Sequence, residues 1–310
     1  MADVNGPVHY LEYDGPRDAP TIICLHALGC HHATWVGIAP LLAERARVLV
    51  PDLIGFGYTP PAGRSAGLAS QRAMIDGFIA ATCPDPPVIV GNSLGGAVAL
   101  LEASANPAAL AGLILMAPAL AVPRAYALAG ISPMMIGIFA ATLSPRVSLS
   151  AVARWVVKIS PERFVAEMTR VCTVDSSRVP PEVIDACLAV ARDRSVRMPW
   201  RATAFTQAAR SVIRYSTRPT RFRRMLQTID VPTLMLFGEQ DRLVPRPVAA
   251  AAAAVRPDWD VILLEELGHM PQIEDPTTTA AAIQGWLDAR LTRAGVTQPT
   301  LEVVQDGAFG

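Results

Sequence analysis

A serine set between glycines, at the junction of a strand and a helix, constrains this chain more than any other feature. Residues 91–96 (GNSLGG) follow the apolar run 87–90, whose β-branched residues predict a buried strand. Residues 97–103 follow, and their composition predicts a helix. Gly91 and Gly95 lack the Cβ atoms that would clash where the helix packs back on the strand. The pattern therefore predicts a sharp turn that exposes the Ser93 hydroxyl at the carboxyl end of a sheet, as in a nucleophile elbow.

The backbone amide of Leu94 lies at the N-terminus of the predicted helix, where the helix dipole favours negative charge. An oxyanion that develops when Ser93 attacks a carbonyl would be stabilised at this amide. The alternative is that the glycines only make a tight connection. The strand before and the helix after Ser93 favour the catalytic interpretation.

A serine hydroxyl needs a general base, and the base needs an acid to orient it. The chain has five histidines, and none lies between residues 33 and 268. His269 follows the predicted strand 260–264, so in a parallel sheet it lies on the same rim as Ser93. We expect His269 to be the base, although a polar surface role is the alternative.

The acid should also follow a strand. The run 231–238 predicts a buried strand, and Asp241 comes directly after it. The order Ser93, Asp241, His269 differs from the chain orders of the two serine-protease types. Glu239 is the alternative acid on the same loop. Asp241 has two alternative structural roles, as a helix cap or as the ion-pair partner of Arg242.

Strands and helices alternate through the first 118 residues and again after residue 229, which predicts an α/β fold with a doubly wound, mostly parallel sheet. Between them, prolines break a region that predicts several helices and no convincing strand. We expect residues 1–118 and 229–310 to form the core and 119–228 to form a helical insertion. Predicted strands span 8–13, 21–25, 47–51, 87–90, 113–117, 231–238 and 260–264; predicted helices span 35–44, 68–83, 94–104 and 277–290.

Several segments, taken in order, resemble the α/β-hydrolase family over about residues 8–290. They are IICLHALG at 22–29 with Trp35 downstream, PDLIGFGYT at 51–59, the elbow, GEQD at 238–241 and Gly268-His269. The resemblance implies that the backbone N–H of Leu28 is a second oxyanion donor, and that the inserted region is a cap over the active site. The family usually has glycine after the first histidine, whereas this chain has Ala27. Its Cβ affects the path of the loop and thereby the position of the Leu28 amide.

The remaining histidines have structural interpretations. We expect His26 to orient the oxyanion loop through hydrogen bonds, and Asp52 to brace its own turn. His31 and His32 are expected on the loop surface or at the pocket entrance. No Cys or carboxylate stands at ligand spacing around them, so we predict no metal site. The sequence has no P-loop and no Gly-x-Gly-x-x-Gly after a strand, so we predict no cofactor.

Composition limits the class of protein. Hydrophobic residues make up 51% of the 310 residues and charged residues 17%, which is typical of a compact globular chain. The N-terminus has no signal-peptide pattern, and five cysteines without a Cys-x-x-Cys motif predict free thiols, so we expect a cytoplasmic protein. No aromatic-basic pattern predicts nucleic-acid binding, and oligomeric state is not predicted.

Two features distinguish the predicted cap. Residues 125–145 carry no charge, but internal proline and glycines argue against a membrane span, so we expect an apolar cap helix, over the active site or within the core of the cap. Residues 120–228 hold 17 basic and 6 acidic side chains, while the rest of the chain has 10 and 21. We favour a solvated arginine face; attraction of anionic substrates or peripheral contact with an anionic membrane is the alternative.

The sequence thus predicts a serine hydrolase (EC 3.1.1 class) that cleaves a carboxylic ester with an apolar acyl or alcohol part through an acyl-enzyme. The alternatives are a carbon–carbon bond hydrolase of ring-cleavage products, a thioesterase or a lactonase. Many carbon–carbon hydrolases carry tryptophan directly after the catalytic histidine. This chain has Met270 after His269, which makes the first of these alternatives less favoured. A non-catalytic ligand-binding protein on the same fold is the alternative from another class.

Overall fold

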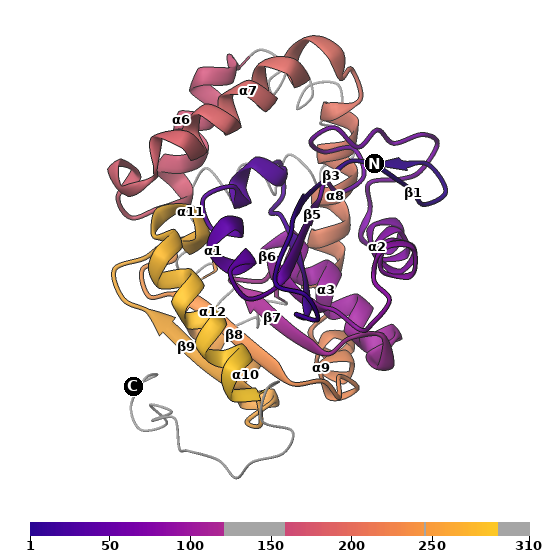
Figure 1. Cartoon of the computed structure of the whole chain (residues 1–310), viewed down its shortest axis with the longest axis vertical. Helices are drawn as coiled ribbons and strands as arrows, with labels where there is room; N and C mark the ends of the chain where they lie inside the picture. Colours follow the sequence, from indigo (N-terminus) through magenta and orange to yellow (C-terminus); the bar gives the residue numbers. More distant parts are fainter. Residues whose placement is uncertain (121–158, 245, 291–310) are drawn as a thin grey trace.

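A seven-stranded sheet forms the centre of the molecule. The structure is a computed structural model that describes residues 1–120, 159–244 and 246–290 (Figure 1). The strand order is β3-β5-β4-β6-β7-β8-β9; β3 runs antiparallel to β5, and all other neighbours are parallel. The predicted doubly wound, mostly parallel sheet is confirmed. The strands are β3 (Tyr10–Tyr13), β4 (Thr21–Leu25), β5 (Arg47–Pro51), β6 (Val88–Asn92), β7 (Gly112–Met116), β8 (Thr233–Gly238) and β9 (Asp260–Leu264), with a separate pair β1 (Ala2–Asp3) and β2 (Pro7–Val8).

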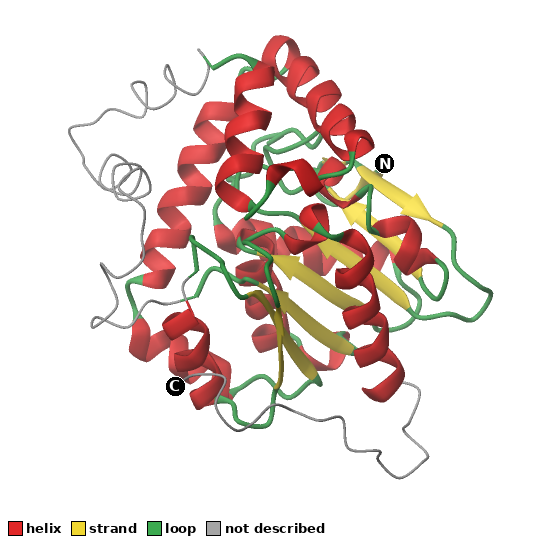
Figure 2. Ribbon diagram, turned by 90° about the vertical axis from the view of Figure 1, so that its left-hand side faces the viewer, coloured by secondary structure: helices red, strands yellow, loops and turns green. Residues whose placement is uncertain are grey.

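Helices cover both faces of the sheet, as Figure 2 shows. Successive side chains of a strand point to opposite faces, so Ile22 and Cys24 join one buried cluster while Ile23 and Leu25 join the other. Because both faces are buried, the strands read as continuous apolar runs rather than alternating ones. One face packs on α1 (Ala39–Ala43) and α12 (Pro276–Arg290); the other packs on α2 (Leu68–Thr82), α3 (Leu94–Ala105) and α10 (Arg246–Val255).

Four described α-helices lie in the chain between β7 and β8. They are α6 (Pro161–Cys172), α7 (Pro181–Arg197), α8 (Arg201–Ser216) and α9 (Pro219–Gln227). Proline is the first residue of three of them, where its missing N–H costs nothing, so the prediction of helices broken by prolines is confirmed over this part. The apolar segment 125–145 lies outside the described residues. Among the helices that the structure does describe, none has the length and apolar character needed to cross a membrane.

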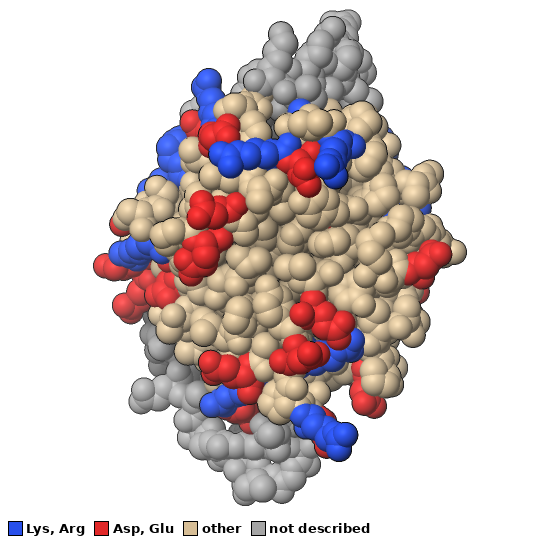
Figure 3. Space-filling model, turned by 45° about the horizontal axis from the view of Figure 1, so that its top comes forward, with Lys and Arg blue, Asp and Glu red and all other residues tan. Residues whose placement is uncertain are grey.

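The arginines of this region are distributed over separate surfaces. Four exposed ones, Arg218, Arg221, Arg223 and Arg224, lie at or on α9, which packs against α3 and α10. At the end of α9, Thr228 bonds Ser104, which lies at the far end of α3 from Ser93. On α7, in contrast, arginines pair with acidic neighbours, and Figure 3 shows basic and acidic side chains side by side on this face.

The five cysteines are free, as predicted. Cys24, Cys30 and Cys187 are buried. Burial raises the pKa of both Cys30 and Cys187 to about 12, so these thiols stay protonated at neutral pH.

Two helical glycines should respond in opposite ways to the same substitution. A Cβ on Gly95 of α3 would lie 2.3 Å from the carbonyl oxygen of Leu25, whereas a Cβ on Gly285 of α12 would meet no atom within 4 Å. We expect Gly95→Ala to lower the free energy of unfolding by roughly 2 kcal/mol or more through the backbone clash. Gly285→Ala should raise it by about 0.5–1 kcal/mol through reduced chain entropy. Urea unfolding of both variants checks this, and equal effects would contradict the packing of α3.

Candidate active site

Ser93 occupies the strained turn that the sequence predicts. It lies between β6 and α3 with φ 53° and ψ −109°, a conformation that a non-glycine residue rarely adopts. Its N–H donates to the Met116 carbonyl at 3.1 Å, which holds the turn against the end of β7. A Cβ on Gly91 would lie 2.5 Å from the carbonyl oxygen of Gly95, so glycine is required where α3 folds back on β6.

Asp241 and His269 form a buried pair. The Nδ1 of His269 lies 2.8 Å from Oδ2 of Asp241, and the two side chains are 4% and 2% exposed. Because the carboxylate accepts, Nδ1 carries the proton and Nε2 is left as the basic nitrogen. The other carboxylate oxygen accepts from the N–H groups of Leu243 and Val244 at 2.7 and 2.9 Å, so Asp241 is held in place from its own loop.

Glu239 is the alternative acid, and it lies on the same loop. Its backbone N–H donates to the carbonyl oxygen of Leu264 in β9, which continues the pairing with β9 one residue beyond the end of β8. The structure thus brings Asp241, two residues further along, to the imidazole of His269.

Asn92 fastens the turn of Ser93 to the loop of His269. Its Nδ2 donates to the carbonyl oxygens of Met116 at 3.1 Å and His269 at 3.0 Å, and its Oδ1 accepts from Gln272 at 3.2 Å. The side chain is fully buried. These contacts place the backbone of His269 beside the residue that precedes Ser93. The sequence analysis missed Asn92 because no local pattern marks a contact across 177 residues.

Glu274 fixes the other side of the His269 loop. Its carboxylate, 1% exposed, accepts from the N–H groups of Gly268, Val174 and Asp175, each at 2.8 Å. In addition, Met270 N–H donates to the carbonyl oxygen of Cys172 at 3.0 Å. The loop that carries His269 is therefore bonded directly to the end of α6 and the segment after it. The sequence analysis did not predict this link.

The loop after β4 makes a tight turn. The N–H of Cys30 donates to the carbonyl of Ala27 at 3.1 Å, and Gly29 has φ 80°, which together describe a type II turn with Leu28 at its second position. The amide of Leu28 takes no part in that turn bond. The positive φ falls on Gly29 and not on Ala27, so the loop does not require glycine at position 27. The methyl group of Ala27 instead packs in the apolar cluster that contains Met270.

His26 links this loop to the next one. Its Nδ1 donates to the Ala27 carbonyl at 2.8 Å, and its Nε2 accepts from the Leu53 N–H at 3.0 Å. The predicted orienting contacts of His26 are therefore present. Burial lowers the pKa of His26 to about 4, against the opposing attraction of Asp52, so the ring is neutral near pH 7.

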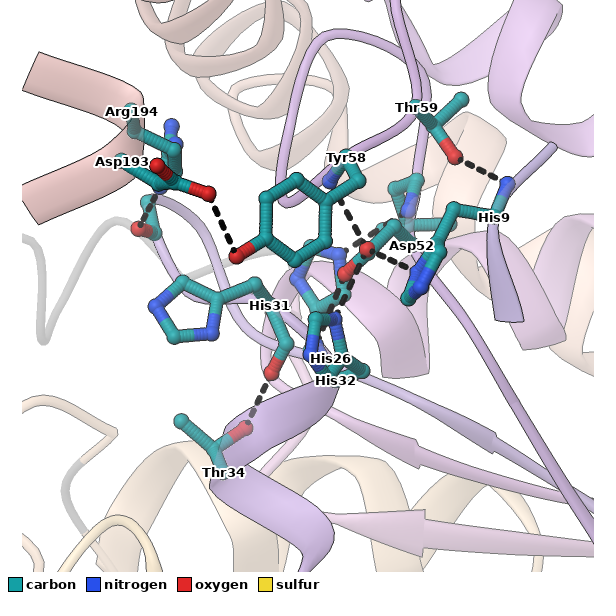
Figure 4. A network of polar contacts seen from close by, with 12 residues as sticks. His9, His26, His31, His32, Thr34, Asp52, Tyr58, Thr59, Asp193 and Arg194 are labelled. Atoms are coloured by element: carbon teal, nitrogen blue, oxygen red, sulfur yellow. Dashed lines mark hydrogen bonds and ion pairs between the residues drawn. The ribbon is translucent and has the colours of Figure 1, made fainter. Parts of the chain in front are cut away.

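Asp52 is the centre of a buried polar network, drawn in Figure 4. Its carboxylate accepts from the backbone and Nδ1 of His32, from Nδ1 of His9 and from the backbone of Tyr58, at 2.8–2.9 Å. The backbone N–H of His9 also donates to Thr59 at 2.9 Å. Burial alone would raise the pKa of Asp52, but the bonds from His32 and His9 hold it well below its usual range. Asp52 thus braces its own turn, as predicted, and joins it to two other segments.

The expectation that His31 and His32 lie on the loop surface is wrong. They are 3% and 6% exposed, because α7 covers the short helix His32–Trp35 that they begin. His32 contributes to the network of Asp52, and the Thr34 hydroxyl donates to the carbonyl oxygen of His31 at 2.9 Å.

One described cluster has the composition of a metal site. The side-chain ligand atoms of His9, His32 and Asp52 lie within 4.8 Å of one another, so a carboxylate distant in sequence does reach His32. Both Nδ1 atoms already lie 2.8 Å from the same carboxylate oxygen, where they donate hydrogen bonds. In this arrangement the two histidines stabilise the buried carboxylate by hydrogen bonds. That the cluster holds no metal stays a prediction.

Stability should fall in mild acid, with His26 as one cause. Its folded pKa of about 4 lies below the unfolded value near 6.5, so between these values only the unfolded chain takes up the proton. The free energy of unfolding should therefore drop by about 3 kcal/mol as pH falls from 6.5 to 4. His26→Gln keeps an acceptor for Leu53 but does not titrate, so its stability should depend less on pH in this window. Urea unfolding at several pH values measures both slopes, and identical slopes would contradict the assignment.

Known proteins resemble this chain along most of its length. The pimeloyl-[acyl-carrier protein] methyl ester esterase of Edwardsiella ictaluri is 27% identical over 277 residues, 89% of this chain and 95% of that protein. Human monoacylglycerol lipase ABHD6 is 24% identical over 278 residues, 88% of this chain and 76% of that protein. A solved thermophilic esterase from Thermogutta terrifontis has a TM-score of 0.67 and 25% identity, covering 90% of this chain and 92% of its own.

The family comparison agrees with the observed topology. Residues 22–282 match the model of the alpha/beta hydrolase family, a span that runs from the start of β4 into α12. It includes the Ser93 turn, Asp241 and His269. The chain belongs to the alpha/beta hydrolase family.

Proposed function

We propose that this protein is a serine hydrolase that cleaves carboxylic esters with an apolar acyl or alcohol part. Ser93 is the nucleophile, His269 the general base and Asp241 the acid that orients it. The observation that carries the proposal is the buried Asp241–His269 pair, with a carboxylate-to-imidazole distance of 2.8 Å, fastened through Asn92 to the strained turn of Ser93.

The geometry of these groups supports a two-step reaction. Ser93 Oγ attacks the ester carbonyl while His269 Nε2 takes its proton; the same proton then goes to the leaving alcohol. Asp241 accepts from Nδ1 and stabilises the imidazolium that forms between these steps. Water, activated by His269, then attacks the acyl-enzyme and frees Ser93.

Two backbone amides are proposed to stabilise the oxyanion. Leu94 is the first residue of α3, so its N–H lies at the positive end of the helix. Leu28 sits in the type II turn after β4, the strand next to β6 in the sheet. Because both donors are backbone groups at the carboxyl ends of neighbouring parallel strands, their positions are fixed before substrate binds.

The ester substrate follows from the relatives. The two curated proteins described above are named for the hydrolysis of a methyl ester and of a monoacylglycerol, and both are carboxylic esters. The aromatic side chains near the site support an apolar part of the substrate. A Cβ on Gly29 would lie 3.3 Å from a ring carbon of Phe205 and 3.9 Å from one of Phe164, so aromatic rings stand directly over the oxyanion loop.

We further propose the division of the chain into a core, residues 1–118 and 229–310, and a cap, residues 119–228. The apolar cluster between them joins Ala27 and Cys30 of the oxyanion loop to Val183, Cys187 and Val190 of α7. Packing of this kind excludes water from the reacting groups, which strengthens the interactions of the charges that develop there.

Removal of the Ser93 hydroxyl tests the nucleophile. Ser93→Ala should lower kcat by about 10³- to 10⁶-fold on p-nitrophenyl esters and leave folding intact, because the hydroxyl is needed only in the reaction. Ser104→Ala, which removes a hydroxyl at the other end of α3, is the matched control and should keep wild-type turnover. The series from acetate to palmitate shows which acyl length fits best. Undiminished turnover by Ser93→Ala would refute the proposal.

The two candidate acids can be separated by matched amide substitutions. Asp241→Asn should lower kcat by about 10⁴-fold, because the amide stabilises the wrong tautomer of His269 and cannot balance its charge. Glu239→Gln makes the same change on the same loop at the carboxylate that the proposal leaves out of the pair, so kcat should change less than about threefold. Steady-state kinetics on one p-nitrophenyl ester decides between them; the reverse ranking would make Glu239 the acid.

A further inference from the structure

Arg194 is a buried cation without an anionic partner among the residues that the structure describes. The side chain, on α7, is 8% exposed. Its Nη1 donates to the carbonyl oxygen of Gly29 at 3.3 Å, a long hydrogen bond, and its Nε is buried with no acceptor in the described part of the chain. Burial lowers the pKa of Arg194, which reflects the cost of removing the charge from water.

The other arginines of the last turns of α7 show how differently Arg194 is placed. Arg192 pairs with Glu162 at 2.9 Å and Arg197 with Asp193 at 3.6 Å, and both arginines are more than half exposed. Arg194 points inward instead. Asp52 attracts it from a distance, but that carboxylate already accepts four hydrogen bonds from His9, His32 and Tyr58.

An unpaired buried guanidinium is costly, since each unsatisfied donor loses its hydration without a replacement. A bound anion that supplies the acceptor would offset this cost through charge-assisted hydrogen bonds. The Nε–H together with a terminal N–H makes the planar fork that binds both oxygens of a carboxylate. The chemistry of Arg194 therefore fits a small anion, and a carboxylate above all.

The position of Arg194 relates it to the proposed reaction. Figure 4 shows the side chain reaching from α7 toward the loop that carries His31. The carbonyl that it contacts belongs to Gly29, the residue directly after Leu28, whose amide is a proposed oxyanion donor. Phe164 and Phe205 lie against the same Gly29 and lower the local dielectric. An anion bound by Arg194 would thus sit within a few ångströms of the oxyanion loop.

We propose that Arg194 determines specificity by binding a carboxylate of the substrate, so that the substrates are esters that also carry a carboxylate near the scissile bond. This inference rests on the proposed ester hydrolysis. It narrows the substrate class from apolar esters to half-esters of short dicarboxylic acids or similar molecules, in which an apolar chain joins the two groups.

The test compares charged and neutral esters of the same shape. The anionic series is the monoethyl esters of malonic, succinic, glutaric and adipic acids. In the neutral series an isopropyl group replaces each carboxylate, so that ethyl 4-methylpentanoate matches monoethyl succinate. A pH-stat records the acid released by wild type, Arg194→Met, Arg194→Lys and the control Arg192→Met, which removes an exposed arginine from the same helix.

Wild type should prefer the anionic member of at least one pair. Arg194→Met should lower kcat/KM on that ester by about 10- to 100-fold, mainly through KM, and change the neutral partner less than about threefold. Arg194→Lys keeps the charge but loses the fork, so its kcat/KM on the anionic ester should fall between the values of wild type and Arg194→Met. Arg192→Met should match wild type on both series. An equal loss on both series, or a wild type that prefers the neutral esters, would show that Arg194 only braces the loop.

Calorimetry separates this inference from the proposed function. Binding of the preferred monoethyl ester to Ser93→Ala should be at least 10-fold tighter than to Ser93→Ala/Arg194→Lys, whether or not wild type hydrolyses it. Arginine-dependent binding without turnover would refute the esterase and keep the anion site. Turnover without arginine-dependent binding would refute the anion site and keep the esterase. Thermal unfolding of each variant confirms that the comparison is between folded proteins.

Discussion

The close approach of α3 to the ends of β4 and β6 is the contact on which the site depends. Backbone lies against backbone there, and the missing Cβ atoms of Gly91 and Gly95 permit it. The contact does more than turn the chain. Because Leu25 ends β4 just before the proposed oxyanion loop, the packing of Gly95 on its carbonyl sets the start of α3 beside that loop. The amides of Leu28 and Leu94 are thereby placed on one rim.

Buried polar side chains hold the loops around this contact. Asp52, Asn92 and Glu274 are at most 1% exposed, and each bonds backbone groups from segments far apart in the chain. A buried polar group left without partners costs about 1–3 kcal/mol, so each of these side chains specifies its neighbours as well as stabilising them. The loops of His269 and Ser93 thus have defined positions although neither belongs to a helix or strand.

The helices inserted between β7 and β8 contact the loops that carry the proposed catalytic groups. Glu274 bonds the segment after α6, Cys172 accepts from Met270, and α7 packs on the oxyanion loop. Their charge is also organised. Most of the basic excess of residues 120–228 in the described helices is exposed, whereas one guanidinium, that of Arg194, is turned toward the oxyanion loop. The net charge of the region therefore says less about its binding chemistry than the burial of this residue.

Local rules of chain geometry let the sequence by itself determine the sheet, the turn of Ser93 and the order of Ser93, Asp241 and His269. Strand periodicity, glycine placement and proline at helix starts act within a few residues, and the predicted bounds of β4, β5 and β9 match the structure. Only the tertiary structure decided that Asp241 and not Glu239 meets His269, and that His31 and His32 are buried. It alone showed the contacts of Asn92, Glu274 and Arg194. The physical reason is that the partners of these side chains lie in distant parts of the chain, and no local pattern encodes such partners. For Arg194, the described residues offer one carbonyl oxygen to Nη1 and no acceptor to Nε.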